Sequence, residues 1–448
     1  MRCEFMHIEF ATHWASIRVF IPHGLDMNAS RPVSSWTSRV SALFLALIAA
    51  WFVAHFFDEK LHPEAETALA PRPFSVAAAE NGAFAAWGIL LPADWDAARR
   101  HAAGQALVAG AMRKDYPPQY QAGAADEAAA REIGGVKPLD FNNVSPLCTE
   151  ERDPCLERVR KARSTAESKR SDADAKRELE ERLLLERYRA LYRYPHYQSA
   201  WPEPTSEFHP WFALGRAHGL MRREALARLL DGQSSDAVEE VLADIGFARK
   251  LLAEGRTREQ KNFAAAALRG DLLSLLEIVG SGPQGAAALR ARLADLEQAL
   301  RPLDAREKDW GPAVDATFAN VVAGVDDLRG KEWFLRLPLL QRNATLNVVW
   351  AEYGPMRAAG RGANPPEVME RYNEHVERVR ANSRRWPLFN PFGIELLSGR
   401  DEVYESQWPR EHGRTAPAMF LTAGEFDEMA RKLLDRLAAP ADEGKKAG

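Results

Sequence analysis

Apolar residues recur at every third or fourth position over long stretches between residues 211 and 300. One such face carries Val238, Val241, Ile245 and Leu252, and the same spacing returns in the two segments that follow. A period of 3.6 residues indicates amphipathic helices that bury one face. The segments between these faces are only a few residues long, so neighbouring helices are expected to run antiparallel. The pattern predicts a mainly α fold with stacked antiparallel helix pairs.

Polar residues mark the expected beginnings of several of these helices. A short acceptor side chain followed three residues later by Glu or Gln fits a capping box, in which the two side chains satisfy each other's backbone amides. Pairs with this spacing are Asp236 and Glu239, Thr257 and Gln260, Asp304 and Glu307, and Thr422 and Glu425. We therefore expect helices to begin at these four positions.

The longest apolar run, from Val40 to Phe57, contains no Asp, Glu, Lys or Arg. As a helix it would extend roughly 27 Å, which is close to the hydrocarbon thickness of a bilayer. Arg31 and Arg39 precede the run, whereas mostly acidic residues follow it. Because basic flanks stay in the cytoplasm, the pattern predicts a transmembrane helix over residues 40–57, with the N-terminus inside and the C-terminal part translocated.

Alternatives for this end of the chain stay open. Ala68-Leu69-Ala70 has the small-x-small form of a signal-peptidase site, so cleavage after Ala70 would release a soluble exported protein. The apolar run is longer than the core of a usual signal peptide, which favours an uncleaved anchor, and a buried helix of a soluble protein is the third reading. A basic segment follows Met27 at once, so residues 1–26 are interpreted as a misassigned extension or a short cytoplasmic tail.

Composition shifts along the chain indicate its organisation. The expected parts are a cytoplasmic segment (1–39), the transmembrane helix (40–57), a linker (58–80), an irregular and helical subdomain with a cysteine pair (81–205), a helical array (206–302), a second helical region (303–440) and a tail (441–448). The linker is proposed because it holds three prolines and many alanines. The translocated part is therefore expected to be an all-α ectodomain.

Two of the three cysteines, Cys148 and Cys155, are separated by six residues. An exported domain lies in an oxidising compartment, where such a pair usually forms a disulfide. Closing so short a loop stabilises the folded state by roughly 2.5 kcal/mol in the chain-entropy account. The spacing differs from the C-x-x-C of redox enzymes, and no further zinc ligands are evident nearby. A structural disulfide is expected, with free thiols as the alternative.

Residues 188–212 combine aromatic side chains with prolines. The candidates for an aromatic binding surface are Tyr192, Tyr194, Tyr197, Trp201 and Trp211. Aromatic rings on a Pro-rich loop can form a platform for a sugar or an extended peptide. The alternative is a hydrophobic seam that covers one end of the helical array.

Charge and motifs narrow the function classes. The net charge of −4 provides no overall basic field, so no nucleic-acid partner is expected. The G-x-S-x-G, S-x-x-K and H-E-x-x-H motifs are absent, and no catalytic residue is assigned. Residues 280–285 have the G-x-G-x-x-G spacing but follow a helical pattern, so they indicate a turn between helices. His196, His209 and His218 fit no single helical face, so neither a metal site nor a cofactor is predicted.

Four short segments resemble blocks in a group of uncharacterised Gram-negative bacterial proteins. These segments are ENGAFAAWGI (80–89), LCTEERDPCLERV (147–159), LPLLQRNATLN (337–347) and WPLFNPFG (386–393). The resemblance extends over most of residues 80–395. It implies one N-terminal membrane span and a helical periplasmic domain, but it implies no activity and no functional residues.

Together these features predict a single-pass inner-membrane protein, with its N-terminus in the cytoplasm and its C-terminal domain in the periplasm. Residues 40–57 would contact the lipid bilayer, and the helical domain would bind or scaffold a protein or peptide partner of the cell envelope. The alternative is a periplasmic hydrolase acting on cell-wall or polysaccharide material. A deep pocket with converging carboxylates would favour the hydrolase, and a shallow concave face would favour the scaffold.

Overall fold

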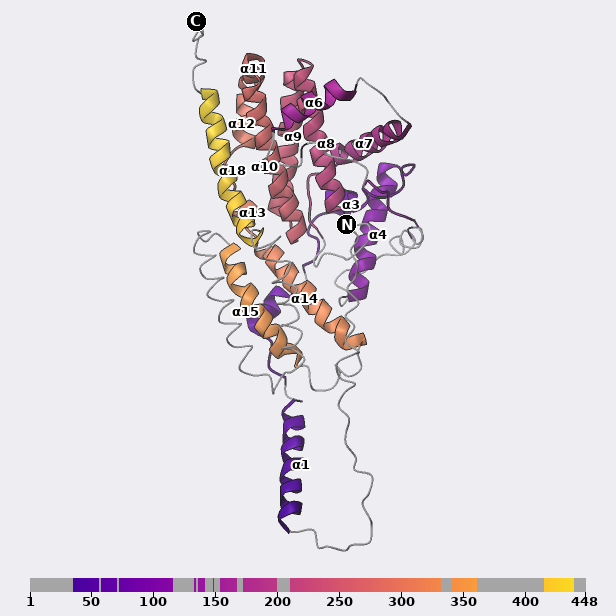
Figure 1. The fold of residues 1–448 in the computed structure, drawn as a ribbon, viewed down its shortest axis with the longest axis vertical. Helices are drawn as coiled ribbons and strands as arrows, with labels where there is room; N and C mark the ends of the chain where they lie inside the picture. Colours follow the sequence, from indigo (N-terminus) through magenta and orange to yellow (C-terminus); the bar gives the residue numbers. More distant parts are fainter. Residues whose placement is uncertain are drawn as a thin grey trace. The chain divides into compact units, whose positions relative to one another are not determined.

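The computed structural model describes residues 35–55, 58–70, 72–115, 133, 136–141, 148, 154–166, 172–199, 210–331, 341–360 and 415–438. The chain divides into two compact units, residues 1–54 and 55–448. The described element of the first unit is helix α1 (Ser35–His55) (Figure 1). None of the helices in the described ranges is both long and apolar enough to cross a membrane.

The second unit is built from helices. They are α2 (Pro63–Ala68), the 3-10 turn η1 (Ala78–Glu80), α3 (Gly82–Trp87), α4 (Ala97–Asp115), α6 (Cys155–Ala166), α7 (Asp172–Leu191), α8 (Trp211–Leu230), α9 (Ser234–Glu254), α10 (Arg258–Gly280), α11 (Pro283–Ala291), α12 (Leu293–Ala299), α13 (Ala305–Lys308), α14 (Gly311–Lys331), α15 (Arg342–Gly360) and α18 (Thr415–Ala438). The described residues contain no β-strand. The predicted all-α fold is therefore confirmed.

Helices α8, α9 and α10 form the centre of the larger hydrophobic core (Figure 1). Joints of three residues connect α8 to α9 and α9 to α10, and each helix packs on the next. Because so short a joint reverses the chain, these consecutive helices run antiparallel. Leu220, Val241 and Leu272 are fully buried where the three helices meet. Helices α6 and α7 pack on α8, and α18 packs on α10.

A single core joins regions that the sequence pattern treats separately. Tyr188 of α7, Leu220 of α8, Trp310 and Leu433 of α18 all belong to it. The predicted bounds near residues 205 and 302 therefore do not separate distinct cores.

A second cluster packs α2 against α14 and α15. Its buried members include Ala65 and Ala68 of α2 together with Phe318 and Leu346. Residues 58–80 were expected to be a linker, and this packed helix corrects that expectation. The alanines that suggest a linker instead have side chains small enough for α2 to pack closely on α14 and α15.

The start of the same segment is also held in place. The Asp58 carboxylate accepts hydrogen bonds from the backbone N–H groups of Asn343 (2.7 Å) and Ala344 (3.1 Å), at the beginning of α15. A carboxylate at this position satisfies backbone amides that have no partner inside the helix. His62 caps α2 in turn, because its Nδ1 accepts from the Glu64 N–H at 3.3 Å.

Candidate functional site

Three helices of the larger core each place one ionisable side chain at the same buried point. His218 comes from α8, Asp244 from α9 and Asp271 from α10. One imidazole nitrogen and one carboxylate oxygen from each aspartate lie within 4.8 Å of one another. We call these three residues the His–Asp–Asp cluster.

The Nε2 atom of His218 faces both carboxylates. It lies 3.1 Å from Asp271 Oδ1 and 3.4 Å from Asp244 Oδ2. Both aspartates are fully buried, and His218 is 8% exposed. Among the described residues, no donor lies in good hydrogen-bond geometry at the Oδ2 atom of either aspartate, and the Tyr192 hydroxyl interacts with the Asp244 carboxylate. Buried carboxylate oxygens without a donor are costly, so the cluster needs either a proton or a cation.

Neighbouring groups orient two members of the cluster. The Tyr188 hydroxyl, from α7, donates to Asp244 Oδ1 at 2.8 Å. The imidazole of His218 is also hydrogen-bonded to the backbone carbonyl of Ala267. These contacts hold the Asp244 carboxylate and the His218 ring in fixed directions. Their rotamers are therefore set before any ion or proton binds.

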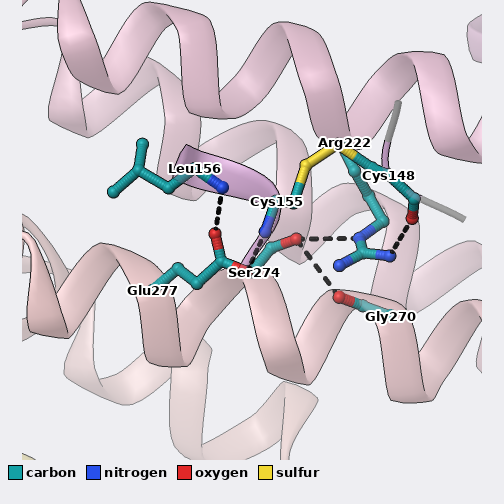
Figure 2. Close-up of a disulfide and its surroundings, with 7 residues drawn as sticks. All are labelled: Cys148, Cys155, Leu156, Arg222, Gly270, Ser274 and Glu277. Carbon is teal, nitrogen blue, oxygen red and sulfur yellow. Dashed lines mark hydrogen bonds between the residues drawn. A yellow bond between two sulfur atoms is a disulfide. The ribbon is translucent and has the colours of Figure 1, made fainter. Parts of the chain in front are cut away.

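Arg222 of α8 connects this region to the segment around Cys148. Its Nε donates to Ser274 Oγ at 3.0 Å, and its Nη1 donates to the Cys148 carbonyl at 2.6 Å (Figure 2). A side chain at Gly270 would place its first carbon 2.7 Å from the His218 ring. Glycine at this position therefore allows α10 to approach α8 closely enough to form the cluster.

The cysteine pair lies beside the same helices. Cys148 and Cys155 are at disulfide distance, as predicted, with their Cα atoms 5.1 Å apart. The backbone N–H groups of Cys155 and Leu156 donate to the Glu277 carboxylate of α10 at 2.9 and 2.5 Å (Figure 2). The disulfide and the Glu277 cap thus hold the first turn of α6 against α10.

Burial controls the titration of the cluster. It raises the pKa values of Asp271 and Asp244 well above the ordinary carboxyl range, and repulsion from Asp271 raises the pKa of Asp244 further. Burial lowers the pKa of His218 to about 4, so its imidazole is neutral at pH 7. Burial also raises the pKa of Tyr188, whose hydroxyl therefore remains a donor. The nearby Arg222 guanidinium opposes the rise in the pKa of Asp271, and a shared proton or a bound cation between the two carboxylates would balance the remaining charge.

This arrangement suits ion or proton binding better than hydrolysis. Polymer hydrolysis needs carboxyl groups that a sugar or peptide can reach. Asp244 and Asp271 have no exposed surface, because α8, α9 and α10 enclose them. This pair of converging carboxylates is therefore closed to a large substrate.

The aromatic candidates from the sequence do not form one exposed surface. Tyr197 is fully buried, and its hydroxyl donates to a backbone carbonyl. Tyr192, Tyr194 and Trp211 are partly buried against the larger core. Trp201 lies outside the described residues. The four described side chains are placed as the hydrophobic-seam alternative expects.

Other sequence candidates have separate surroundings. Helix α10 ends at Gly280 and α11 begins at Pro283, so the glycine-rich segment is the expected turn between helices. Gly282 has φ of 127°, a conformation that favours glycine. His196 Nδ1 lies 2.9 Å from Glu254 Oε1. His209 lies outside the described residues.

The sequence analysis missed the cluster because its members lie 26 and 27 residues apart, on three helices. A signal was nevertheless present. Asp244 follows the buried Val241 by three residues, and Asp271 follows the buried Leu268 by three. An acidic residue in the apolar stripe of a helix needs a buried partner. Two such positions on neighbouring helices, with His218 on the helix before them, would have pointed to this site.

No protein-family model, no curated protein and no solved structure matches this chain. The resemblance to Gram-negative membrane-anchored proteins stays a prediction.

Proposed function

We propose that the chain is a single-pass inner-membrane protein whose periplasmic α-helical domain binds or scaffolds protein or peptide partners in the cell envelope. The observation that carries the proposal is the exposure of apolar side chains along α1. Leu43, Phe44, Leu45 and Leu47 are 62%, 63%, 65% and 60% exposed. Exposed apolar surface costs roughly 25 cal/mol per Å² in water, so a helix of this composition is expected to be covered. The occupant proposed here is the bilayer.

The flanking sequence supports the same placement. The uncharged run extends to Phe57, two residues beyond the described end of α1 at His55. Arg31 and Arg39 lie on the proposed cytoplasmic side, and acidic residues follow on the other. A disulfide pair downstream of the run suits export to an oxidising compartment.

The domain has a groove that suits the binding of a protein partner better than catalysis. It lies along α9 and the α12–α13 segment, and Arg249, Arg301 and Glu307 line it. Its charges pair with one another, because Glu307 Oε2 lies 2.8 Å from an Arg249 nitrogen and 3.0 Å from an Arg301 nitrogen. Arg292 and Asp295 also line the groove, and their side chains are 36% and 55% exposed, so they can contact a polar partner. This feature supports scaffolding over the hydrolase alternative.

Topology reporters test the placement. A phosphatase fused after Gly448 is expected to be active, and a reporter that works only in the cytosol is expected to be silent at the same position. The reverse pattern would reject the proposal together with its periplasmic compartment.

A paired substitution tests whether α1 is the anchor. Arginine at the centre of an inserting helix costs about 2.5–3.5 kcal/mol, so Leu45→Arg combined with Ile48→Arg is expected to move the full chain from the membrane pellet to the soluble fraction. Leu179→Arg is the matched control, because Leu179 is 65% exposed on α7 and lies outside the run. That control is expected to stay in the pellet. Retention of the double variant would show that another feature attaches the chain.

A crosslinking comparison tests the scaffold. A photo-crosslinking residue at Lys250, which lines the groove, is expected to give one discrete protein adduct in intact envelopes. The same residue at Lys176, on the exposed part of α7, is expected not to give that adduct. Identical adducts at both positions would count against the groove as the binding surface.

A further inference from the structure

We propose that the His–Asp–Asp cluster binds one divalent first-row transition-metal ion, with Zn²⁺ as the best fit. The ligands are His218 Nε2 and one carboxylate oxygen each from Asp244 and Asp271. The site is separate from the proposed envelope function, because its ligands lie inside the core and not in the groove along α9.

The spacing of the ligand atoms already suits an ion. Two ligands bonded to one ion at about 2.0–2.1 Å, at an angle of about 90–110°, lie about 3.0–3.4 Å apart. His218 Nε2 lies 3.1 Å from one aspartate oxygen and 3.4 Å from the other. The two nitrogen–oxygen distances therefore match those of ligands that share an ion, and the carboxylate oxygens lie within 4.8 Å of each other.

The donor types favour a transition metal. Imidazole suits zinc and its neighbours in the first row, whereas Ca²⁺ and Mg²⁺ prefer six or more oxygen ligands. The Ala267 carbonyl holds the His218 ring, and its Nε2 faces the two carboxylates. A second carboxylate oxygen would complete a four-coordinate sphere. Among the described residues, no donor lies in good hydrogen-bond geometry at the Oδ2 atom of either fully buried aspartate, so each carboxylate retains acceptor capacity.

The surroundings resemble the outer shell of a metal site. Metal-binding carboxylates and imidazoles are usually fixed by further hydrogen bonds. Here Tyr188 donates to Asp244, and the Ala267 carbonyl is hydrogen-bonded to His218. The two positive charges of the ion would balance the two carboxylates. The competing arrangement is a single proton shared between Asp244 and Asp271, with no metal.

An ion here would hold α8, α9 and α10 together, because each helix supplies one ligand. Burial of all three ligands leaves no room for a polymer substrate, so the proposed role is structural. Metal binding to the folded state stabilises it in proportion to the logarithm of ion concentration over Kd. We therefore expect the melting temperature to depend on the metal ion.

The first test uses the unchanged full chain. After dialysis against a chelator, titration with Zn²⁺ is expected to reach one ion per chain and to raise Tm by about 3–6 °C. Co²⁺ is expected to bind at the same stoichiometry and to give the visible absorption of a four-coordinate site. A chain that binds no stoichiometric Zn²⁺ or Co²⁺ and shows no Tm shift would overturn the proposal and leave the shared proton.

Variants then assign the ligands. His218→Gln and Asp271→Asn are each expected to weaken the affinity for Zn²⁺ at least tenfold. Each is also expected to remove the Zn²⁺-dependent rise in Tm. His196→Gln is the matched control, because His196 pairs with Glu254 away from the cluster, and it is expected to retain one ion per chain. Normal Zn²⁺ binding by folded Asp271→Asn would overturn the assignment. If a variant fails to fold, the Co²⁺ spectrum of the unchanged chain still decides between metal and proton.

Discussion

Lys261 is an ionisable side chain that the core has enclosed. It is 1% exposed, its Nζ donates to the Leu252 carbonyl at 2.6 Å, and Nζ lies 5.7 Å from the ring centroid of Trp310. Burial lowers the pKa of Lys261 to about 8. One carbonyl and one aromatic face therefore replace only part of the hydration that the ammonium group loses.

This burial predicts a specific pH dependence for Lys261→Met. The folded-state pKa of about 8 is below the ordinary lysine value of 10.5, so between these pH values the unfolded chain binds one more proton. Stability of the unchanged chain should therefore rise by about 1.4 kcal/mol per pH unit in this window, apart from other groups. Below pH 8 the full cost of the buried charge is present. We expect Lys261→Met to be more stable than the unchanged chain at pH 7, and the advantage to shrink towards pH 10.5.

Urea unfolding at pH 7, 8, 9 and 10 measures this difference. Lys250→Met is the control, because it removes a lysine from the same helix pair region, on α9, where the side chain is exposed to solvent. A difference between Lys261→Met and the unchanged chain that does not vary with pH would contradict the proposed cost of burial.

Helix caps show what a short motif can and cannot predict. Thr257 accepts from the Gln260 N–H at the start of α10, and Asp304 forms a complete capping box with Glu307, as predicted. Asp236 instead lies in the first turn of α9, which begins at Ser234, and Thr422 lies inside α18. Those two predicted starts were wrong. The three-residue spacing also occurs inside helices, and an acid in the first turn is favourable through the helix dipole without being the cap.

At the scale of elements, one buried carboxylate connects the chain before α3 to the second cluster. Asp315 of α14 is fully buried and pairs with Arg72 and with Arg357 of α15, whose Nε lies 2.6 Å from Asp315 Oδ1. Three segments distant in the sequence therefore meet at a single side chain. Removing one partner of such a buried group leaves the remaining charges uncompensated.

Asp315→Asn is expected to destabilise the protein by about 3 kcal/mol, because two guanidinium groups lose their carboxylate. Asp326→Asn is the control, since Asp326 also connects α14 to α15 through Arg342 but is 45% exposed at its side chain. An exposed pair contributes about 0.2–1 kcal/mol, so the control should have a small effect. Denaturant unfolding measures both, and equal losses would contradict the importance of burial at Asp315.

The helices of the array could be predicted, whereas their partners could not. The hydrophobic periodicity over residues 211–300 predicts amphipathic helices, and the structure has α8, α9, α10 and α11–α12 there. The prediction succeeds because each of these helices buries one continuous stripe of apolar side chains. Helix α2 was missed because six residues are too few for a periodic pattern. The His–Asp–Asp cluster was missed because periodicity shows which face is buried and not which residues meet across helices.

At the scale of the whole molecule, the proposed anchor and the disulfide make one joint prediction. If α1 directs export, Cys148 and Cys155 reach an oxidising compartment and form their disulfide, whereas in the cytosol they stay reduced. When cells are quenched with acid and the protein is denatured before alkylation, the cysteine pair of the unchanged chain should therefore resist alkylation until a reductant is added. The Leu45→Arg, Ile48→Arg variant should keep its chain in the cytosol, and both of its thiols should be alkylated without a reductant.

The alkylation pattern separates export from folding. Leu179→Arg, which leaves the apolar run intact, should protect the cysteine pair as the unchanged chain does. The chain has a third cysteine, Cys3, so the measurement uses a Cys3→Ser background in which every thiol belongs to the predicted disulfide. Protection of the pair in the double-arginine variant would mean that oxidation does not depend on α1. Reduced thiols in the unchanged chain would contradict the proposed compartment, because a cysteine pair at disulfide distance is expected to be oxidised in an oxidising environment.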